Sequence, residues 1–182
     1  RAKMPVGQGV WSAIWMLPTD EIYGAWAASG EIDIVEAVNL GADCRSCKGR
    51  VENRVIGTIH YGDEWPRNKY KGEHVKMPES DDGFHTYAVE WEAGRITWFI
   101  DGEPYSTLRS KDWSSGALFS SKSKTAPFDQ PFHLILNVAI GGNLAEDNNS
   151  GGISLADFPK SMEVDWVRVY QRNDTDAVET GE

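Results

Sequence analysis

The residue types best suited to chemistry stand together in the segment G-E-I-D-I-V-E. Its β-branched and apolar content is typical of a strand, in which alternate side chains point to opposite faces. Glu31 and Asp33 then share one face, and the isoleucines between and after them enter the core. Strict alternation would bury Glu36, whereas a β-bulge near Ile34 and Val35 returns Glu36 to the acidic face. We therefore expect three carboxylates in a row.

Three interpretations of such a row of carboxylates are compatible with the spacing. Two carboxyl groups about 5–5.5 Å apart are the machinery of a retaining glycosidase. With the Cα atoms of Glu31 and Glu36 about 13 Å apart, at ~3.3 Å per strand step, the side chains would have to lean together over Asp33. Asp33 could share a proton with a neighbour and raise the pKa of the acid. The other readings are a calcium site made from the three carboxylates and an acidic face open to solvent.

Aromatic side chains favour the catalytic reading. The chain has eight Trp, six Tyr and six Phe. Trp11 and Trp15 share a strand face, Trp26 lies five residues before Glu31, and Trp65 follows soon after the next predicted strand. Indole rings beside carboxylates are typical of sugar clefts, because the ring stacks on the apolar face of a pyranose. Each tryptophan taken singly also fits a core position.

Composition excludes several other classes of protein. The chain has 182 residues, the size of one domain, and 18 Lys and Arg against 28 Asp and Glu give a net charge of −10. A nucleic-acid partner requires a clustered positive surface, which this balance opposes. The sequence contains no apolar run of about 18 residues, the length that a membrane-spanning helix needs. Cys44 and Cys47 lack a second pair for a zinc site, so we expect a small loop disulfide in an exported protein, with a free thiol pair as the alternative.

Period-two alternation between Gly-, Asp- and Asn-rich connections predicts an all-β fold, a jelly-roll sandwich of two antiparallel sheets. Asp101-Gly102 is a strong hairpin turn signal. The stretch 110–124 is expected to be a short helix or a long loop, and the polar tail 173–182 to be frayed. The expected strands are residues 10–17, 31–38, 53–61, 85–91, 96–100, 132–140 and 162–171.

Several of these segments resemble glycoside hydrolase family 16. The strongest are G-V-W-S-A-I-W-M-L-P at residues 9–18 and A-S-G-E-I-D-I-V-E-A at residues 28–37, and the similarity runs from residue 1 to about residue 172. The bulged E-x-D-x-x-E form resembles the laminarinases, which are endo-β-1,3-glucanases, whereas lichenases carry E-x-D-x-E. Further matches lie at residues 57–62, 84–91, 131–139 and 164–171.

The resemblance implies a concanavalin A-like sandwich with a concave sugar-binding cleft and retaining endo-hydrolysis of β-1,3-glucosidic bonds in laminarin-type β-glucans. It makes Glu31 the nucleophile, Glu36 the general acid/base and Asp33 their electrostatic assistant. It implies no cofactor for catalysis and a structural calcium ion on the convex face, to which Asp165 would contribute. The residues expected to line the cleft are Trp11, Trp15, Trp26, His60 and Asn137, joined by Trp65 from the aromatic argument.

The main departure is that family domains begin some tens of residues before the position matching Arg1. We therefore expect an N-terminally incomplete catalytic domain over residues 1–172. Unpaired strand edges would favour a homodimer or a strand-exchanged assembly. A glucan polymer is met outside the cell, so we expect a secreted protein. The alternatives are a non-catalytic or weakly active β-glucan-binding, lectin-like remnant, and a family member acting on mixed-linkage glucan or another β-linked polysaccharide.

Overall fold

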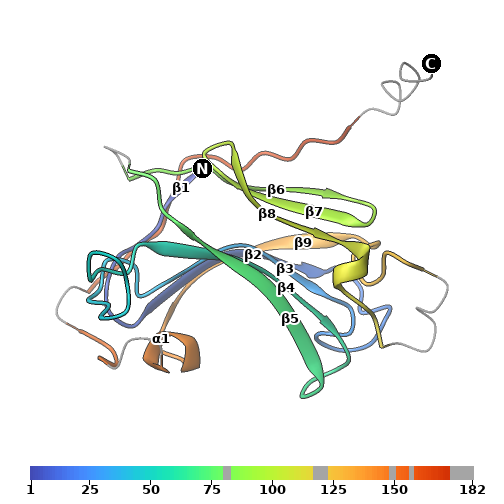
Figure 1. Cartoon of the computed structure of the whole chain (residues 1–182), viewed down its shortest axis with the longest axis horizontal. Coiled ribbons are helices and arrows are strands. Elements are labelled where there is room, and N and C mark those ends of the chain that lie inside the picture. Colours follow the sequence, from blue (N-terminus) through green and yellow to red (C-terminus); the bar gives the residue numbers. More distant parts are fainter. Residues whose placement is uncertain (80–82, 117–122, 148–150, 156–157, 173–182) are drawn as a thin grey trace.

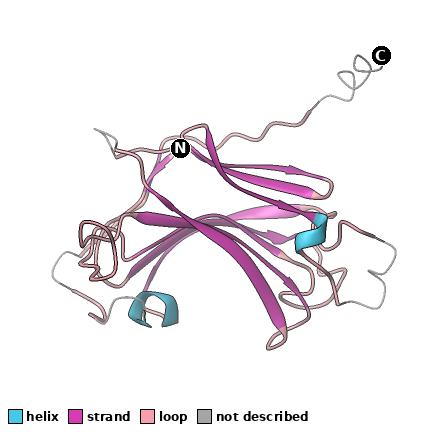
Figure 2. Ribbon diagram, in the orientation of Figure 1, coloured by secondary structure: helices cyan, strands magenta, loops and turns pink. Residues whose placement is uncertain are grey.

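Two antiparallel β-sheets lie face to face in the computed structural model (Figures 1 and 2). The structure describes residues 1–79, 83–116, 123–147, 151–155 and 158–172. One sheet has the strand order β5-β4-β3-β2-β9, formed by Asn68–Lys76, Arg54–Gly62, Glu31–Val38, Val10–Pro18 and Phe132–Ile140. The other has the order β6-β7-β8, formed by Tyr87–Glu92, Arg95–Ile100 and Glu103–Arg109. A separate two-stranded pair joins β1 (Ala2–Lys3) to β10 (Glu163–Val164).

The hydrophobic core fills the space between the two sheets. Alternate residues of β7 enter it, so Ile96, Trp98 and Ile100 are at most 3% exposed. They pack in two clusters with side chains of the five-stranded sheet, among them Ile32 and Val35 of β3. Burial of these apolar faces stabilises the sandwich. It also leaves the opposite face of the five-stranded sheet available for polar side chains.

That opposite face is concave. Figure 1 shows the five-stranded sheet arching over the short helix α1 (Asn143–Asp147), with the three-stranded sheet on its other side. A second short helix, the 3₁₀ turn η1 (Ser110–Asp112), follows β8. In the described ranges no helix is long and apolar enough to cross a membrane.

The predicted fold class and most predicted strands are confirmed. The strands expected at 31–38 and 132–140 have the observed bounds of β3 and β9, and the others in the two sheets agree within two residues. The Asp101-Gly102 turn joins β7 to β8 with φ of 50° and 87°, the positive values that a tight hairpin requires. Of the stretch 110–124, η1 and an irregular segment are described, and residues 117–122 lie outside the described ranges.

Strand prediction failed where the side-chain pattern was weak. Both β5 and β8 were missed. The sequence of β5, N-K-Y-K-G-E-H-V-K, is polar on both faces at the edge of its sheet. The sequence of β8, E-P-Y-S-T-L-R, is mostly polar and contains a proline, and β8 is also an edge strand. The strand predicted at 162–171 was wrong in extent, since only Glu163–Val164 pair, and they pair with β1 alone. After β10, Asp165 and Trp166 still form backbone hydrogen bonds with Arg1. Beyond them the described residues form no strand, and Val169 there is 83% exposed. Alternating sequence makes a strand only where a neighbour offers its backbone. The tail 173–182 lies outside the described ranges.

Candidate active site

A β-bulge in β3 brings the three carboxylates to the concave face. Asp33 pairs with Thr58 and Glu36 pairs with Ile56, so two residues of β3 stand opposite the single residue Gly57 of β4. The register with β2 shifts at the same point. The predicted bulge is therefore confirmed at Ile34 and Val35, and it is what returns Glu36 to the face that carries Glu31 and Asp33.

Glu31 lies among groups that can bind its charge. One carboxylate oxygen accepts a hydrogen bond from the indole N–H of Trp26, and the other is 3.9 Å from His60 Nε2. Its side chain also shares a hydrogen bond with Asp33. His60 belongs to β4 and pairs directly with Glu31 across the sheet. Its Nε2 is also 3.4 Å from Asp33 Oδ2, so the ring bridges two of the three acids.

Glu36 has a separate set of partners. Its Oε1 accepts a hydrogen bond of 3.0 Å from the indole N–H of Trp11 on β2. The hydroxyl of Thr58 on β4 also bonds its side chain. Glu36 and Asp33 are both buried, at 9% and 2% exposed. Each outer acid therefore has its own tryptophan donor, while Asp33 lies between them.

Burial controls the protonation of all three acids, because taking a carboxylate out of water favours its neutral form. Burial, with the charge of Asp33, raises the pKa of Glu31 to about 8, against the lowering effects of His60 and Trp26. Burial and the charge of Glu36 raise the pKa of Asp33 well above its usual range. Burial also raises the pKa of Glu36, although the Trp11 N–H and the charge of His60 oppose the rise. The group therefore holds protons at neutral pH, as a site that donates one must.

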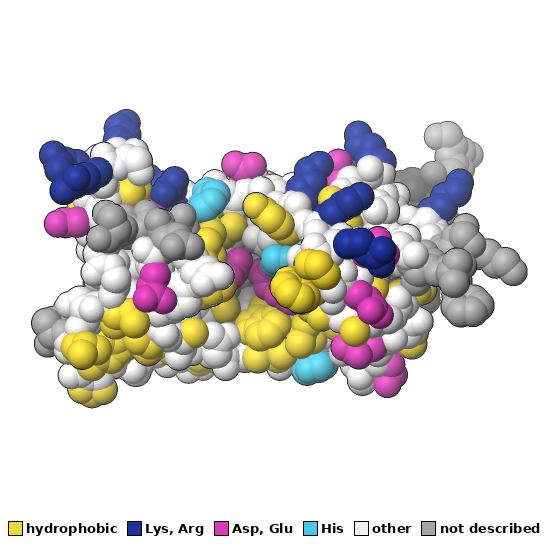
Figure 3. Space-filling model, turned by 90° about the horizontal axis from the view of Figure 1, so that it is seen from below, with side chains coloured by type: hydrophobic (Ala, Val, Ile, Leu, Met, Phe, Trp, Pro, Cys, Tyr) yellow, Lys and Arg dark blue, Asp and Glu magenta, His cyan; other side chains and the backbone are white. Residues whose placement is uncertain are grey.

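A cleft opens beside Glu31 on the concave face. It encloses about 550 Å³, and its walls are formed by Trp15, Leu17, Pro18, Glu21, Trp26, Ser29, Gly30, Glu31 and His133. Figure 3 shows this side of the molecule: it is hollowed near its middle, where acidic and histidine side chains lie among hydrophobic ones. The two indole rings supply flat apolar surface, and the acids and His133 supply polar groups. Such a lining can stack a sugar ring and bind its hydroxyls.

Comparison with known proteins agrees with this geometry. The profile of glycosyl hydrolases family 16 matches residues 1–168. The chain belongs to this family. Hydrolases of family 16 generally need no cofactor.

Relatives of this chain include both enzymes and a glucan-binding protein. A glucan endo-1,3-β-glucosidase A1 from Niallia circulans is 42% identical over 174 residues, which cover 94% of this chain and 23% of that protein. A β-1,3-glucan-binding protein from Penaeus monodon is 37% identical over 156 residues, which cover 78% and 41%.

A solved structure is also similar. A glutamate-to-serine mutant of SCLam, a non-specific endo-β-1,3(4)-glucanase from glycoside hydrolase family 16, was co-crystallised with 1,3-β-D-cellobiosyl-cellobiose. Its structure has a TM-score of 0.67 at 35% identity, covering 94% of this chain and 57% of that one. The chain therefore spans between 23% and 57% of the length of these three proteins.

The remaining predicted cleft residues are Trp15, Asn137 and Trp65, and they differ in how they relate to the cleft. Trp15 lines the cleft and donates a 2.8 Å hydrogen bond to Oδ1 of Asn137 on β9, so Asn137 orients this indole. Trp65 is 71% exposed on the turn after β4, and its backbone N–H donates to the carbonyl of Trp26. Trp65 does not line the cleft beside Glu31.

Sequence reasoning missed three residues near the acids. Glu21 and His133 line the cleft, and Thr58 bonds Glu36. His133 and Thr58 lie on predicted strands, at positions that face the same way as a predicted site residue. Their position on those faces was a usable signal. Glu21 lies in a loop between β2 and β3, and nothing in its sequence context marked it.

Two places in the chain bear on metal binding: the acids beside His60, and Asp165. Glu31, Asp33 and His60 could together hold a metal ion, since one ligand atom from each lies within 4.8 Å of the others. Asp165, the expected calcium ligand, is not part of this group. Its carboxylate forms a 2.9 Å ion pair with Arg1. In the described ranges Asp165 belongs to no group of three candidate ligand side chains, whereas Ca²⁺ takes six to eight oxygens. Backbone carbonyls are also calcium ligands, so the calcium ion expected at Asp165 stays a prediction.

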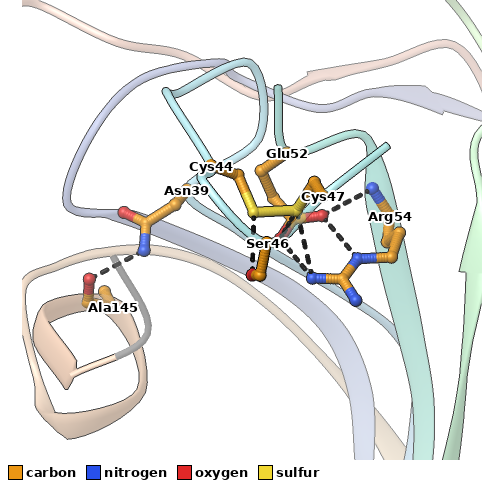
Figure 4. Close-up of polar contacts among 7 residues, drawn as sticks. All are labelled: Asn39, Cys44, Ser46, Cys47, Glu52, Arg54 and Ala145. Carbon is orange, nitrogen blue, oxygen red and sulfur yellow. Dashed lines mark hydrogen bonds and ion pairs between the residues drawn. A yellow bond between two sulfur atoms is a disulfide. The ribbon is translucent and has the colours of Figure 1, made fainter. Parts of the chain in front are cut away.

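Cys44 and Cys47 form a disulfide in the loop between β3 and β4 (Figure 4). Glu52 and Arg54 lie against it as an ion pair of 2.7 Å, and Arg54 also donates to Cys47 Sγ. The same figure shows Asn39, at the start of this loop, donating to the carbonyl of Ala145 in α1. The disulfide therefore closes a loop that borders the acid-bearing strand and does not contact the acids.

Proposed function

We propose that this protein is a retaining endo-hydrolase of β-1,3-glucosidic bonds in laminarin-type β-glucans. The observation that carries the proposal is the bulged β3, which lines Glu31, Asp33 and Glu36 on one face beside an aromatic cleft. Binding alone requires no row of buried carboxylates. Retaining hydrolysis requires two, one as nucleophile and one as acid/base. Similarity to an endo-1,3-β-glucosidase at 42% identity supports the β-1,3 linkage.

In the first step, Glu31 attacks the anomeric carbon and forms a glycosyl ester. The bond to the glycosidic oxygen breaks at the same time, and Glu36 gives that oxygen its proton. Glu31 must be ionised for this attack. Its hydrogen bond to Asp33 provides the route, because a proton that moves to Asp33 leaves a Glu31 carboxylate facing Trp26 and His60. The buried site lets Asp33 hold that proton.

In the second step, Glu36 acts as a base. It takes a proton from water as the water oxygen attacks the anomeric carbon, and the ester bond to Glu31 breaks. The new reducing end keeps the β configuration, and both glutamates return to their starting states. The Trp11 N–H favours the ionised form of Glu36 that this step needs.

The test is release of reducing ends from laminarin and, in parallel, from mixed-linkage β-glucan. Glu31→Gln and Glu36→Gln should lower the rate by at least about a thousandfold, because each removes an essential group. Glu73→Gln is the matched control, since Glu73 is an exposed glutamate on the neighbouring β5. It should retain the wild-type rate. A higher kcat/KM on mixed-linkage glucan than on laminarin would contradict the proposed linkage.

A second candidate is a β-glucan-binding protein without turnover, which the similarity to the Penaeus monodon protein favours. It predicts laminarin binding with no release of reducing ends, and an affinity that Glu31→Gln leaves unchanged. Isothermal titration with laminarin oligosaccharides separates the two candidates. Either way, we propose a secreted protein, because the Cys44–Cys47 disulfide suits an oxidising environment.

A further inference from the structure

A hydrogen bond joins the three-stranded sheet to the bulged strand β3 of the five-stranded sheet. Trp98, on the central strand β7 of the three-stranded sheet, is 1% exposed and points across the core. Its indole Nε1–H donates to the backbone carbonyl oxygen of Asp33 at 2.8 Å. This carbonyl belongs to the last residue that pairs with β4 before the register shifts.

Gly57 makes room for this contact. It is the β4 residue that stands opposite the two bulge residues. A Cβ built at Gly57 would lie 2.4 Å from Trp98 Cδ1 and 2.4 Å from the hydroxyl oxygen of Tyr105 on β8. No side chain fits in that space, so Trp98 can approach the backbone of β3 only because residue 57 is glycine.

A bulge creates a need for such a partner. The extra residue interrupts the hydrogen-bond ladder, and a buried backbone carbonyl without a donor costs free energy. Ile32 and Val35, on either side of this point, are fully buried, so water has no access from the core. A donor fixed in the opposite sheet satisfies the Asp33 carbonyl only when the bulge sits at this place in β3.

We propose that Trp98 is a positioning residue, whose indole N–H holds the β3 bulge in the register that sets Glu36 on the same face as Glu31 and Asp33. The inference rests on the proposed hydrolytic function of these acids. Trp98 does not touch substrate: it lies on the core side of the sheet, and it acts through the backbone of Asp33. Its role goes beyond filling volume, since the hydrogen-bonding atom and its place are both specific.

The chain offers a matched control for packing. Trp91, on β6, packs against the same core cluster, and its indole N–H also donates to a backbone carbonyl, that of Phe128, at 2.9 Å. Phe128 is not in the sheet that carries the acids. Trp91→Phe therefore removes an equivalent indole and an equivalent bond at a place that does not touch the bulge.

The experiment measures kcat and KM on laminarin, together with thermal unfolding, for wild type, Trp98→Phe and Trp91→Phe. Both variants should unfold at a lower temperature. Only Trp98→Phe should lower kcat, by about tenfold or more, with KM within about twofold, because a small displacement of a catalytic group acts on the chemical step. Gly57→Ala, which pushes the indole from its place, should lower kcat in the same way. It serves as the second variant should Trp98→Phe not fold.

Two results would overturn the proposal: a kcat for Trp98→Phe within twofold of wild type, or an equal loss of kcat in Trp91→Phe. Failure of the hydrolytic function gives a different pattern, in which wild type itself releases no reducing ends. The positioning role is then read from the Glu36 side-chain carboxyl carbon by NMR titration. A shifted midpoint in Trp98→Phe and an unshifted one in Trp91→Phe supports it, and unshifted midpoints in both contradict it.

Discussion

Glu36 accepts a hydrogen bond from the indole N–H of Trp11, and this bond favours the ionised carboxylate. Trp11→Phe removes the donor and so raises the pKa of Glu36 further. In the proposed mechanism Glu36 has to be protonated in the first step, and the alkaline limb of kcat/KM reports the pKa of such an acid. We expect that limb to move to higher pH in Trp11→Phe, measured on laminarin oligosaccharides.

Trp15→Phe is the control for this shift, because the Trp15 indole donates to Asn137 and to neither acid. Its alkaline limb should stay at the wild-type pH, although its KM rises through loss of cleft surface. A limb that moves equally in both variants would mean that Trp11 acts through the shape of the cleft and not through Glu36.

The raised pKa of Glu31 also makes a prediction for stability. Its pKa is about 8 in the folded protein against an ordinary value of 4.5, so between these pH values the folded state binds more protons than the unfolded state. Stability attributable to Glu31 therefore falls as pH rises through this window. Glu31→Gln cannot ionise and escapes the loss. Its free energy of unfolding at pH 8 should exceed that of wild type by about 4 kcal/mol.

Urea unfolding at pH 4 and pH 8 checks this expectation. At pH 4 the Glu31 carboxyl is protonated in both states, and the advantage of Glu31→Gln should nearly vanish. Glu73→Gln, at an exposed glutamate of β5, should match wild type at both pH values. An advantage of Glu31→Gln of the same size at both pH values would show that it does not arise from ionisation.

At the scale of elements, Asn39 joins the end of β3 to two neighbouring segments. Its Oδ1 accepts a hydrogen bond from the backbone N–H of Gly9 at 2.6 Å. Its Nδ2 donates to the carbonyl of Ala145 at 2.7 Å, as Figure 4 shows. Asn39 is 1% exposed and has φ of 54°, a left-handed conformation that asparagine tolerates better than alanine. Asn39→Ala should lower the free energy of unfolding by about 3 kcal/mol, measured by urea unfolding.

Asn143→Ala is the comparison, because Asn143 is an exposed asparagine of α1. Its effect should stay within about 0.5 kcal/mol. A loss in Asn39→Ala no larger than this would mean that the three segments hold together without the asparagine.

The sequence predicted elements well where burial imposes alternation, as in β2, β3 and β9. It even located the bulge, since only a bulge keeps Glu36 out of the core. The sequence could not predict hydrogen bonds between residues of distant strands. The bond from Trp98 to the carbonyl of Asp33 spans 65 positions and depends on how the two sheets face each other. β5 was missed because an exposed edge strand needs no apolar face.

At the scale of the whole molecule, apolar side chains are exposed along the edge strand β9. Leu134, Leu136 and Ile140 are 36%, 39% and 45% exposed on the face opposite to Asn137. An unpaired edge with apolar side chains favours association through a second strand or sheet. We propose that the 182-residue chain forms a homodimer or strand-exchanged assembly. Light scattering at micromolar concentration should give about twice 20.3 kDa, and a compact monomer would contradict this.

Double displacement by Glu31 and Glu36 is the proposed route of β-1,3-glucan hydrolysis, and it fixes the stereochemistry of the product. The most direct measurement follows the anomeric configuration of the first reducing ends released from laminarin oligosaccharides, by proton NMR before mutarotation. We expect the β-anomer first from wild type and from Glu73→Gln, and no product from Glu31→Gln. An α-anomer as the first product, or release by Glu31→Gln at the wild-type rate, would contradict this route.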